Sequence, residues 1–155
     1  MRRYVLLAAV PAAFAAGLLA SHLMPVAVAQ TPAPAPLTPQ IIDVGAMTNE
    51  QIGNLVPNVG TLRTRTLVAT ANGTIAVQSG NVPRHTHQDS DEIQYVIAGS
   101  GTFWLGDQQR EVHPGDLIII PRGTVHAGSQ NTGGEFKVLA IKLPPQAPTD
   151  IQFVK

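Results

Sequence analysis

Short stretches in which β-branched and apolar residues alternate with polar ones recur along the chain beyond residue 60. Turn signals that contain glycine separate these stretches, among them Asn72-Gly73, Gly99-Ser100-Gly101 and Gly133-Gly134. No stretch in this region shows the apolar period of an ordinary helix. The pattern predicts nine short strands: Leu62–Thr70, Thr74–Ser79, Pro83–His87, Glu92–Ala98, Thr102–Leu105, Arg110–His113, Leu117–Ile120, Thr124–Ala127 and Glu135–Leu143.

This number and spacing of strands predicts an all-β domain, either a sandwich or a barrel. One short helix is expected before the strands, because Thr48-Asn49-Glu50-Gln51 has the spacing of a capping box. That helix should run to about Leu55, before Pro57 ends it. Residues 30–40 alternate proline with small residues and predict an extended tether. The folded domain is therefore expected over residues 41–155.

Residues 1–29 are typical of an export signal. Arg2-Arg3 supply a positive start, Val5–Ala20 is an uncharged apolar run, and Ala27-Val28-Ala29 resembles a cleavage site before Gln30. We expect cleavage, no stable membrane anchor afterwards, and a periplasmic or secreted protein. An uncleaved anchor is the alternative, because the apolar stretch nearly reaches the length that spans a membrane.

The composition of the chain excludes several kinds of partner and site. Ten basic and ten acidic residues give a formal net charge of zero, and no basic stripe of the kind that binds nucleic acid is present. Nucleic acid is therefore not expected as a partner. The chain has no cysteine, which excludes disulfides, thiolate metal sites and a cysteine nucleophile. Any metal must be bound by histidines and carboxylates.

Two histidines two residues apart, His85 and His87, are the strongest chemical signal in the chain. Side chains along a strand repeat every two residues, so both imidazoles project from one face and can reach one ion. Glu92 follows after a polar turn, and His126 lies 39 residues beyond His87 in a strand that barrel closure could bring to the same point. Three imidazoles and one carboxylate are suitable ligands for a divalent metal.

The neighbours of these residues leave alternatives. Asp91 is a second carboxylate beside Glu92, but strand parity favours Glu92 because it places Glu92 and Gln94 on one face and Ile93 on the other. His113 has no paired histidine nearby, so we expect it to lie outside the site as a structural or solvated residue. The remaining alternative is that all the histidines are scattered surface or core residues without a shared function.

The candidate ligands lie in two motifs that resemble those of the cupin superfamily. The first motif of that family matches Gly80, His85, His87, Glu92 and Gly99. The second motif matches Gly115, Pro121, Gly123 and His126. Its final asparagine is displaced by one position, with Gln130 in the expected place and Asn131 next. The resemblance extends over roughly residues 60–145. It implies an antiparallel double-sheet β-barrel of the jelly-roll type, with a metal bound in its mouth by His85, His87, Glu92 and His126.

The resemblance also suggests the metal and the reaction. Fe or Mn ranks first, and Ni, Cu or Zn would suit the same donors. The expected function is that of a metal-dependent oxygenase acting on a small organic acid or phenolic compound, with Glu92 as ligand and proton acceptor and Gln94 as its polar neighbour. A non-redox lyase or isomerase and a non-catalytic binding module are the alternatives, because one fold hosts all three.

The expected partners follow from the same analysis. A small molecule is expected as ligand or substrate. Sugar phosphates are disfavoured, because few Lys or Arg residues have the parity that would turn them inward near the ligands. A homodimer is expected from the resemblance, with the segment 41–79 adding to a neighbouring sheet.

Overall fold

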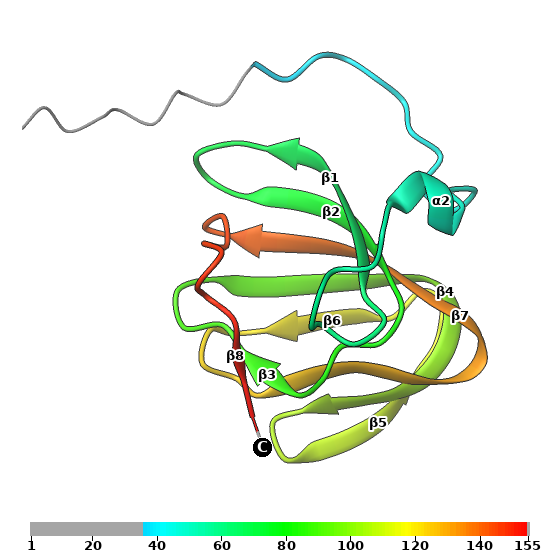
Figure 1. The fold of residues 1–155 in the computed structure, drawn as a ribbon, viewed down its shortest axis with the longest axis vertical. Helices are drawn as coiled ribbons and strands as arrows, with labels where there is room; N and C mark the ends of the chain where they lie inside the picture. The colour runs from blue at the N-terminus through cyan, green and yellow to red at the C-terminus, as the bar shows by residue number, and fades with distance from the viewer. Residues whose placement is uncertain (1–35, 155) are drawn as a thin grey trace, which may run out of the picture. The chain divides into compact units, whose positions relative to one another are not determined.

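The computed structural model describes residues 36–154, apart from the side chains of Gly128 and Ser129. The predicted export signal at 1–29 therefore lies outside the described residues. The described part contains one short helix and eight strands (Figure 1). These elements are α2 (Asn49–Ile52), β1 (Arg63–Ala69), β2 (Thr74–Ser79), β3 (His85–Thr86), β4 (Asp91–Leu105), β5 (Gln108–Val112), β6 (Leu117–Ile120), β7 (His126–Leu143) and β8 (Gln152–Phe153). Within residues 36–154 we find no helix long and apolar enough to cross a membrane.

Two long strands, β4 and β7, pair with each other and belong to both layers of the fold. The first part of β4 and the last part of β7 form one layer, in the order β1-β2-β7-β4-β6. The other halves form a second layer, in the order β8-β3-β7-β4-β5. Every pairing is antiparallel. The predicted all-β fold, an antiparallel double-sheet barrel, is confirmed.

Alternation along the strands determines which side chains enter the core. In β4, Val96 and Phe103 are buried, whereas Tyr95 is exposed. The inner apolar cluster consists of Val96, Phe103, Val112, Ile118, Ile120, Phe136 and Val138. Glu92 and Gln94 have the same parity as Val96, so these buried polar side chains also point inward, beside the apolar cluster.

A second apolar cluster covers the outer face of β1, β2 and β7. Met47 and Ile52, from the helical region, pack against Val77 of β2. The predicted capping box is present. The Thr48 side chain accepts from the Gln51 backbone N–H, and the Gln51 side chain accepts from the Thr48 backbone N–H. The helix ends at Ile52, earlier than predicted, and Gly53 is its C-cap. This cluster buries the outward face of β2 within the same chain.

The prediction of nine strands is wrong in two places. Glu92–Ala98 and Thr102–Leu105 are parts of the single strand β4, and Thr124–Ala127 and Glu135–Leu143 fall largely within β7. The glycines read as turns lie inside these strands, where the two long strands bend together and their register shifts. A further strand, β8, was not predicted; it adds to β3 near the C-terminus (Figure 1).

Candidate metal centre

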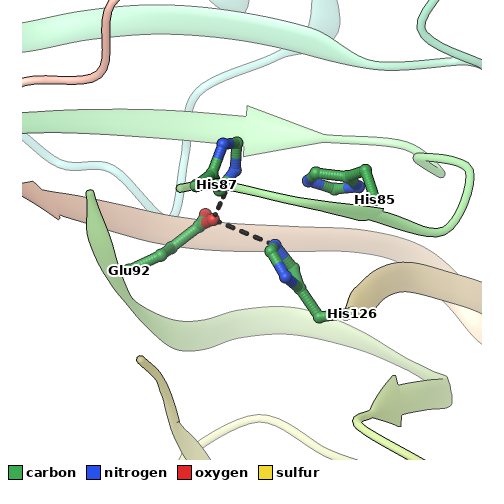
Figure 2. A group of neighbouring side chains, drawn as sticks. All are labelled: His85, His87, Glu92 and His126. Carbon is green, nitrogen blue, oxygen red and sulfur yellow. Dashed lines mark hydrogen bonds and ion pairs between the residues drawn. The ribbon is translucent and has the colours of Figure 1, made fainter. Parts of the chain in front are cut away.

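The fold brings four ligand-type side chains to one point. His85 lies in β3, His87 follows that strand, Glu92 is in β4 and His126 is the first residue of β7. Their ligand atoms all lie within 4.8 Å of one another, and all four residues are buried. Figure 2 shows Glu92 directed at His87 and His126, with the His85 ring beside them. The pairing of His85 with His126 between β3 and β7 accounts for the convergence of the two motifs.

The three histidines are oriented by backbone carbonyls. Nδ1 lies 2.7 Å from the Pro83 carbonyl oxygen in His85, 2.9 Å from that of Thr124 in His126, and 2.5 Å from that of Asp150 in His87. A carbonyl oxygen only accepts, so each Nδ1 carries a proton, and in a neutral ring the lone pair is then on Nε2. These contacts give the imidazoles the tautomer that metal ligation needs.

Glu92 lies at the centre of the cluster. Its Oε2 is 3.2 Å from Nε2 of His87 and 3.2 Å from Nε2 of His126. Burial by itself raises the pKa of Glu92, but the contacts with His126 and His87 and the charge of Lys142 outweigh it and hold that pKa well below its ordinary value. Glu92 is therefore a carboxylate, and it contributes a negative charge to the cluster.

Gln94 and Lys142 complete the surroundings of this carboxylate. Gln94 Nε2 donates to Glu92 Oε1 over 2.8 Å, as its shared parity with Glu92 predicts. Lys142 Nζ lies 2.7 Å from Glu92 Oε2 and 2.7 Å from His87 Nε2, and this lysine is buried. Burial lowers the pKa of Lys142, and the charge of Glu92 opposes that effect.

Lys142 is the residue that the sequence analysis missed. Its position in the strand carried a signal, because Phe136, Val138 and Ala140 precede it at two-residue intervals and all face inward. A lysine in that register turns into the barrel, next to Glu92, with which it is paired across the β4–β7 ladder. We expected few cationic residues to turn inward near the ligands. Lys142 does so, and its ammonium contacts His87 and Glu92.

The remaining candidates lie outside the cluster. Asp91 pairs with Arg122 over 2.9 Å at the exposed start of β4. Hydrogen bonds from the Arg122 side chain and backbone lower the pKa of Asp91 to about 2. His113 is exposed and 3.7 Å from Glu111. Strand parity therefore separates the two neighbouring carboxylates, one inward and one outward.

A cavity of about 400 Å³ opens beside the cluster. Its wall is largely apolar and includes Val56, Leu62 and Ile151. His85, His87, Glu92, Gln94 and Lys142 also line it. A small organic molecule in this cavity would therefore contact the polar cluster at one end and apolar side chains elsewhere.

The segment after β7 supports the cluster from outside the two motifs. Asp150 is buried, and its backbone oxygen orients His87. Its side-chain Oδ1 accepts from the backbone N–H groups of Gln88 and Asp89 over 2.6 and 3.0 Å. Asp150 therefore holds the turn that joins the two histidines of the first motif to Glu92.

The cluster has the chemistry of a divalent metal site. With Nδ1 protonated, His126 can donate to Glu92 over their 3.2 Å contact only when its Nε2 also carries a proton. Only a cation or an added proton makes that contact favourable, and the Lys142 ammonium reaches His87 and Glu92. Three nitrogen lone pairs and a carboxylate oxygen fit Fe, Mn, Ni, Cu or Zn. The structure supports a site that could hold a metal ion.

Comparison with known proteins agrees with this fold. Residues 73–142 match the family described as Cupin domain. A solved structure from Klebsiella pneumoniae, an uncharacterized conserved protein with a double-stranded beta-helix domain, is 16% identical and superposes with a TM-score of 0.56. That likeness covers 70% of this chain and 96% of the other. The family match and the fold together support the cupin superfamily for this chain.

Two relatives share sequence with the same region. Uncharacterized protein MJ1618 of Methanocaldococcus jannaschii is 32% identical over 71 residues, which cover 46% of this chain and 57% of that protein. An acireductone dioxygenase of Frankia alni is 42% identical over 55 residues, 33% of this chain and 26% of that enzyme. The matched region therefore covers less than two thirds of either relative.

Proposed function

We propose that the protein is a metal-dependent oxygenase that acts on a small organic acid or phenolic compound. The main observation behind this proposal is the convergence of three imidazoles, each with its Nδ1 donating to a backbone carbonyl, on one buried carboxylate. Likeness to an acireductone dioxygenase over part of the chain supports an oxygenase among the functions that this fold hosts.

In this proposal His85, His87, Glu92 and His126 bind one divalent ion, with Fe or Mn favoured and Ni, Cu or Zn also suited to the donors. A redox-active ion with open coordination positions would supply the site for a chelating substrate and dioxygen. The chain's own contribution is to keep His85 neutral, to orient the three imidazoles, to keep the carboxylate ionised, and to surround the site with apolar walls.

Glu92 and Gln94 are the proposed catalytic residues. Glu92 Oε1 accepts from Gln94, so that hydrogen bond holds the carboxylate in one orientation. Glu92 can then accept a proton from a bound substrate without leaving the cluster. A lyase or isomerase would use the same base, and the buried ammonium of Lys142 beside it is the observation that favours this second function. Oxygen consumption separates the two.

The test is dioxygen uptake by protein loaded with Fe, Mn or Cu, screened against catechols, flavonols, diketones and small hydroxy acids. We expect uptake only when metal and a chelating substrate are present together. Glu92→Gln should lower turnover far more than substrate binding, because it removes charge and basicity but keeps the size. Tight calorimetric binding of one compound with no uptake under any metal would reject the oxygenase and support the binding module.

Metal content provides the control for that screen. His85→Ala and His126→Ala should each abolish stoichiometric metal, because each removes a ligand atom from the cluster. His113→Ala should retain it, because that exposed side chain lies outside the cluster. Equal metal loss in His113→Ala and His85→Ala would overturn the ligand assignment.

We also propose export and a homodimer. Export is supported by the composition of residues 1–29. The intact mass of protein recovered from outside the cytoplasm should correspond to a chain that begins at Gln30. A full-length mass found only in membranes would reject cleavage. The homodimer is supported by exposed apolar side chains on β4 and β6.

A further inference from the structure

Lys142 balances the charge of the metal-free cluster. Its ammonium and the Glu92 carboxylate lie 2.7 Å apart, and a backbone carbonyl accepts from Nδ1 of each of the three imidazoles around them. The charges of this buried pair therefore cancel. This is the state that burial favours, since an isolated charge in a poorly solvated interior is costly.

A divalent ion changes that balance by two positive charges. The ion would take the Nε2 lone pair of His87, which now accepts from Lys142. The ammonium must then turn away from His87, but it stays on the inward face of β7 in the cavity wall. The site would hold an ion and an ammonium against a single carboxylate, with a net charge of plus two that an anionic ligand would reduce.

No other lysine or arginine among the described residues lines this cavity. Arg122 is paired with Asp91 in the exposed turn. Lys137 lies on the same strand but on the outer face, where its Nζ donates to the carbonyl oxygens of Gly45 and Met47. Arg84 lies with its guanidinium 4.7 Å from the Trp104 ring. Lys142 is therefore the cationic side chain available to a molecule bound beside the cluster.

We infer that Lys142 binds the carboxylate of a chelating organic acid whose apolar body occupies the cavity. This inference rests on the proposed function and narrows its substrate class from organic acids or phenols to chelating carboxylates with an apolar tail. The carboxylate would contact the ion and the ammonium together. Val56, Leu62 and Ile151 in the cavity wall would contact the apolar tail.

The test measures binding rather than turnover. Protein loaded with redox-inert Zn(II) is titrated in a calorimeter with 4-methyl-2-oxopentanoate and with its neutral amide, which keeps the shape and loses the charge. Wild type should bind the carboxylate more tightly than the amide. Lys142→Gln should weaken carboxylate binding by about tenfold or more, as expected for a lost hydrogen bond between charged groups, and should change amide binding little.

Three variants make the result specific. Lys142→Arg should restore most of the carboxylate binding, because it restores the positive charge. Lys137→Gln should bind as wild type, because it removes a lysine from the outer face of the same strand. Lys142→Met retains an apolar stem and serves in place of Lys142→Gln if that variant does not fold. Zn(II) affinity should be unchanged or higher in the neutral variants, since no ammonium competes for His87.

The outcomes distinguish this inference from the proposed function. Equal carboxylate binding by wild type and a folded neutral variant overturns the role of Lys142, and so does tighter binding of the amide than of the carboxylate by wild type. After either result, the proposed oxygenase function is retained if dioxygen uptake occurs. Failure of wild type to bind Zn(II) more tightly than His126→Ala overturns the metal centre, and the inference with it.

Discussion

His85 must stay neutral to bind a metal, and its surroundings enforce that state. Burial, followed by the neighbouring His126, lowers the pKa of His85 to about 3 from an ordinary value of 6.5. In the unfolded chain the imidazole takes up a proton below pH 6.5, but in the folded chain it does not. The unfolded state therefore binds more protons between these two values, and folding stability falls as the pH falls through that range.

We predict this pH dependence for the metal-free protein after treatment with a chelator. Between pH 6 and pH 4, His85 should lower the free energy of unfolding by about 1.4 kcal/mol for each pH unit. Urea unfolding at a series of pH values measures this slope. His85→Gln should reduce the slope by about that amount, whereas the exposed His113→Gln should not. Equal slopes in His85→Gln and wild type would contradict the prediction.

At this scale, strand parity carried most of the information. It chose Glu92 over Asp91 from the sequence, and the structure places Glu92 in the cluster and Asp91 outside. The same rule, applied to Lys142, would have predicted that its side chain points inward. A lysine on a strand is read as solvent-facing because burying its charge is costly unless a partner is present. That partner, Glu92, becomes visible only when β4 and β7 are paired.

At the scale of elements, the bends of β4 and β7 are the features that place the cluster. Gly99 lies at such a bend with φ of 72°, and a Cβ built on it would lie 2.3 Å from the Glu135 backbone oxygen. Gly106 also has positive φ, 59°, in the turn between β4 and β5, but no atom lies within 4 Å of its Cβ position. The two glycines share a positive φ that would strain a residue with a Cβ, and they differ in the space around them.

We predict unequal costs for the two alanine substitutions. Gly106→Ala should lower the free energy of unfolding by about 1 kcal/mol, the cost of positive φ for a residue with a Cβ. Gly99→Ala should lower it by about 3 kcal/mol or more, because the strands must also move apart. Urea unfolding of both variants measures the difference. Similar losses in both would show that β4 and β7 do not approach as closely as described.

The elements that sequence reasoning divided are those in which glycine occurs inside a strand. Gly99-Ser100-Gly101 and Gly133-Gly134 carry the composition of turns, but Ser100 pairs with Gly133 across the two long strands. Glycine serves equally at a turn and at a bend where backbones approach closely. The local sequence does not separate these uses, because the approach involves residues more than thirty positions apart. Uninterrupted strands such as β2 and β6 were predicted with their observed bounds.

At the scale of the whole molecule, two surfaces are open to association: the segment 41–79, where Leu55 is exposed and β1 pairs with β2 alone among the described strands, and the outer face of β4 and β6. Met47, Ile52 and Val77, in the segment 41–79, are buried against their own chain. By contrast, Tyr95, Leu117 and Ile119 are 45, 60 and 62% exposed on the outer face of β4 and β6. Among the described strands, β6 pairs with β4 alone, so it also leaves a free edge beside these side chains.

We predict that the proposed homodimer forms through this face. Light scattering at micromolar concentration should give twice the mass of one chain. Ile119→Lys should shift the mass to that of a monomer, because it places a charge in an apolar contact. Leu55→Lys, in the segment 41–79, should leave the dimer intact. The reverse pattern would restore the interface predicted from sequence, and a monomeric wild type would reject the dimer.

The role of Asp150 has a consequence for the order in which the protein is made. A ribosome releases the chain from its N-terminus, so His85, His87, Glu92 and His126 all emerge before residue 150 does. Until Asp150 emerges, the His87 ring lacks the carbonyl that sets its tautomer, and the backbone N–H groups of Gln88 and Asp89 lack their acceptor. A nascent chain that already contains all four candidate ligands therefore still lacks the contacts that order His87 and the turn before Glu92.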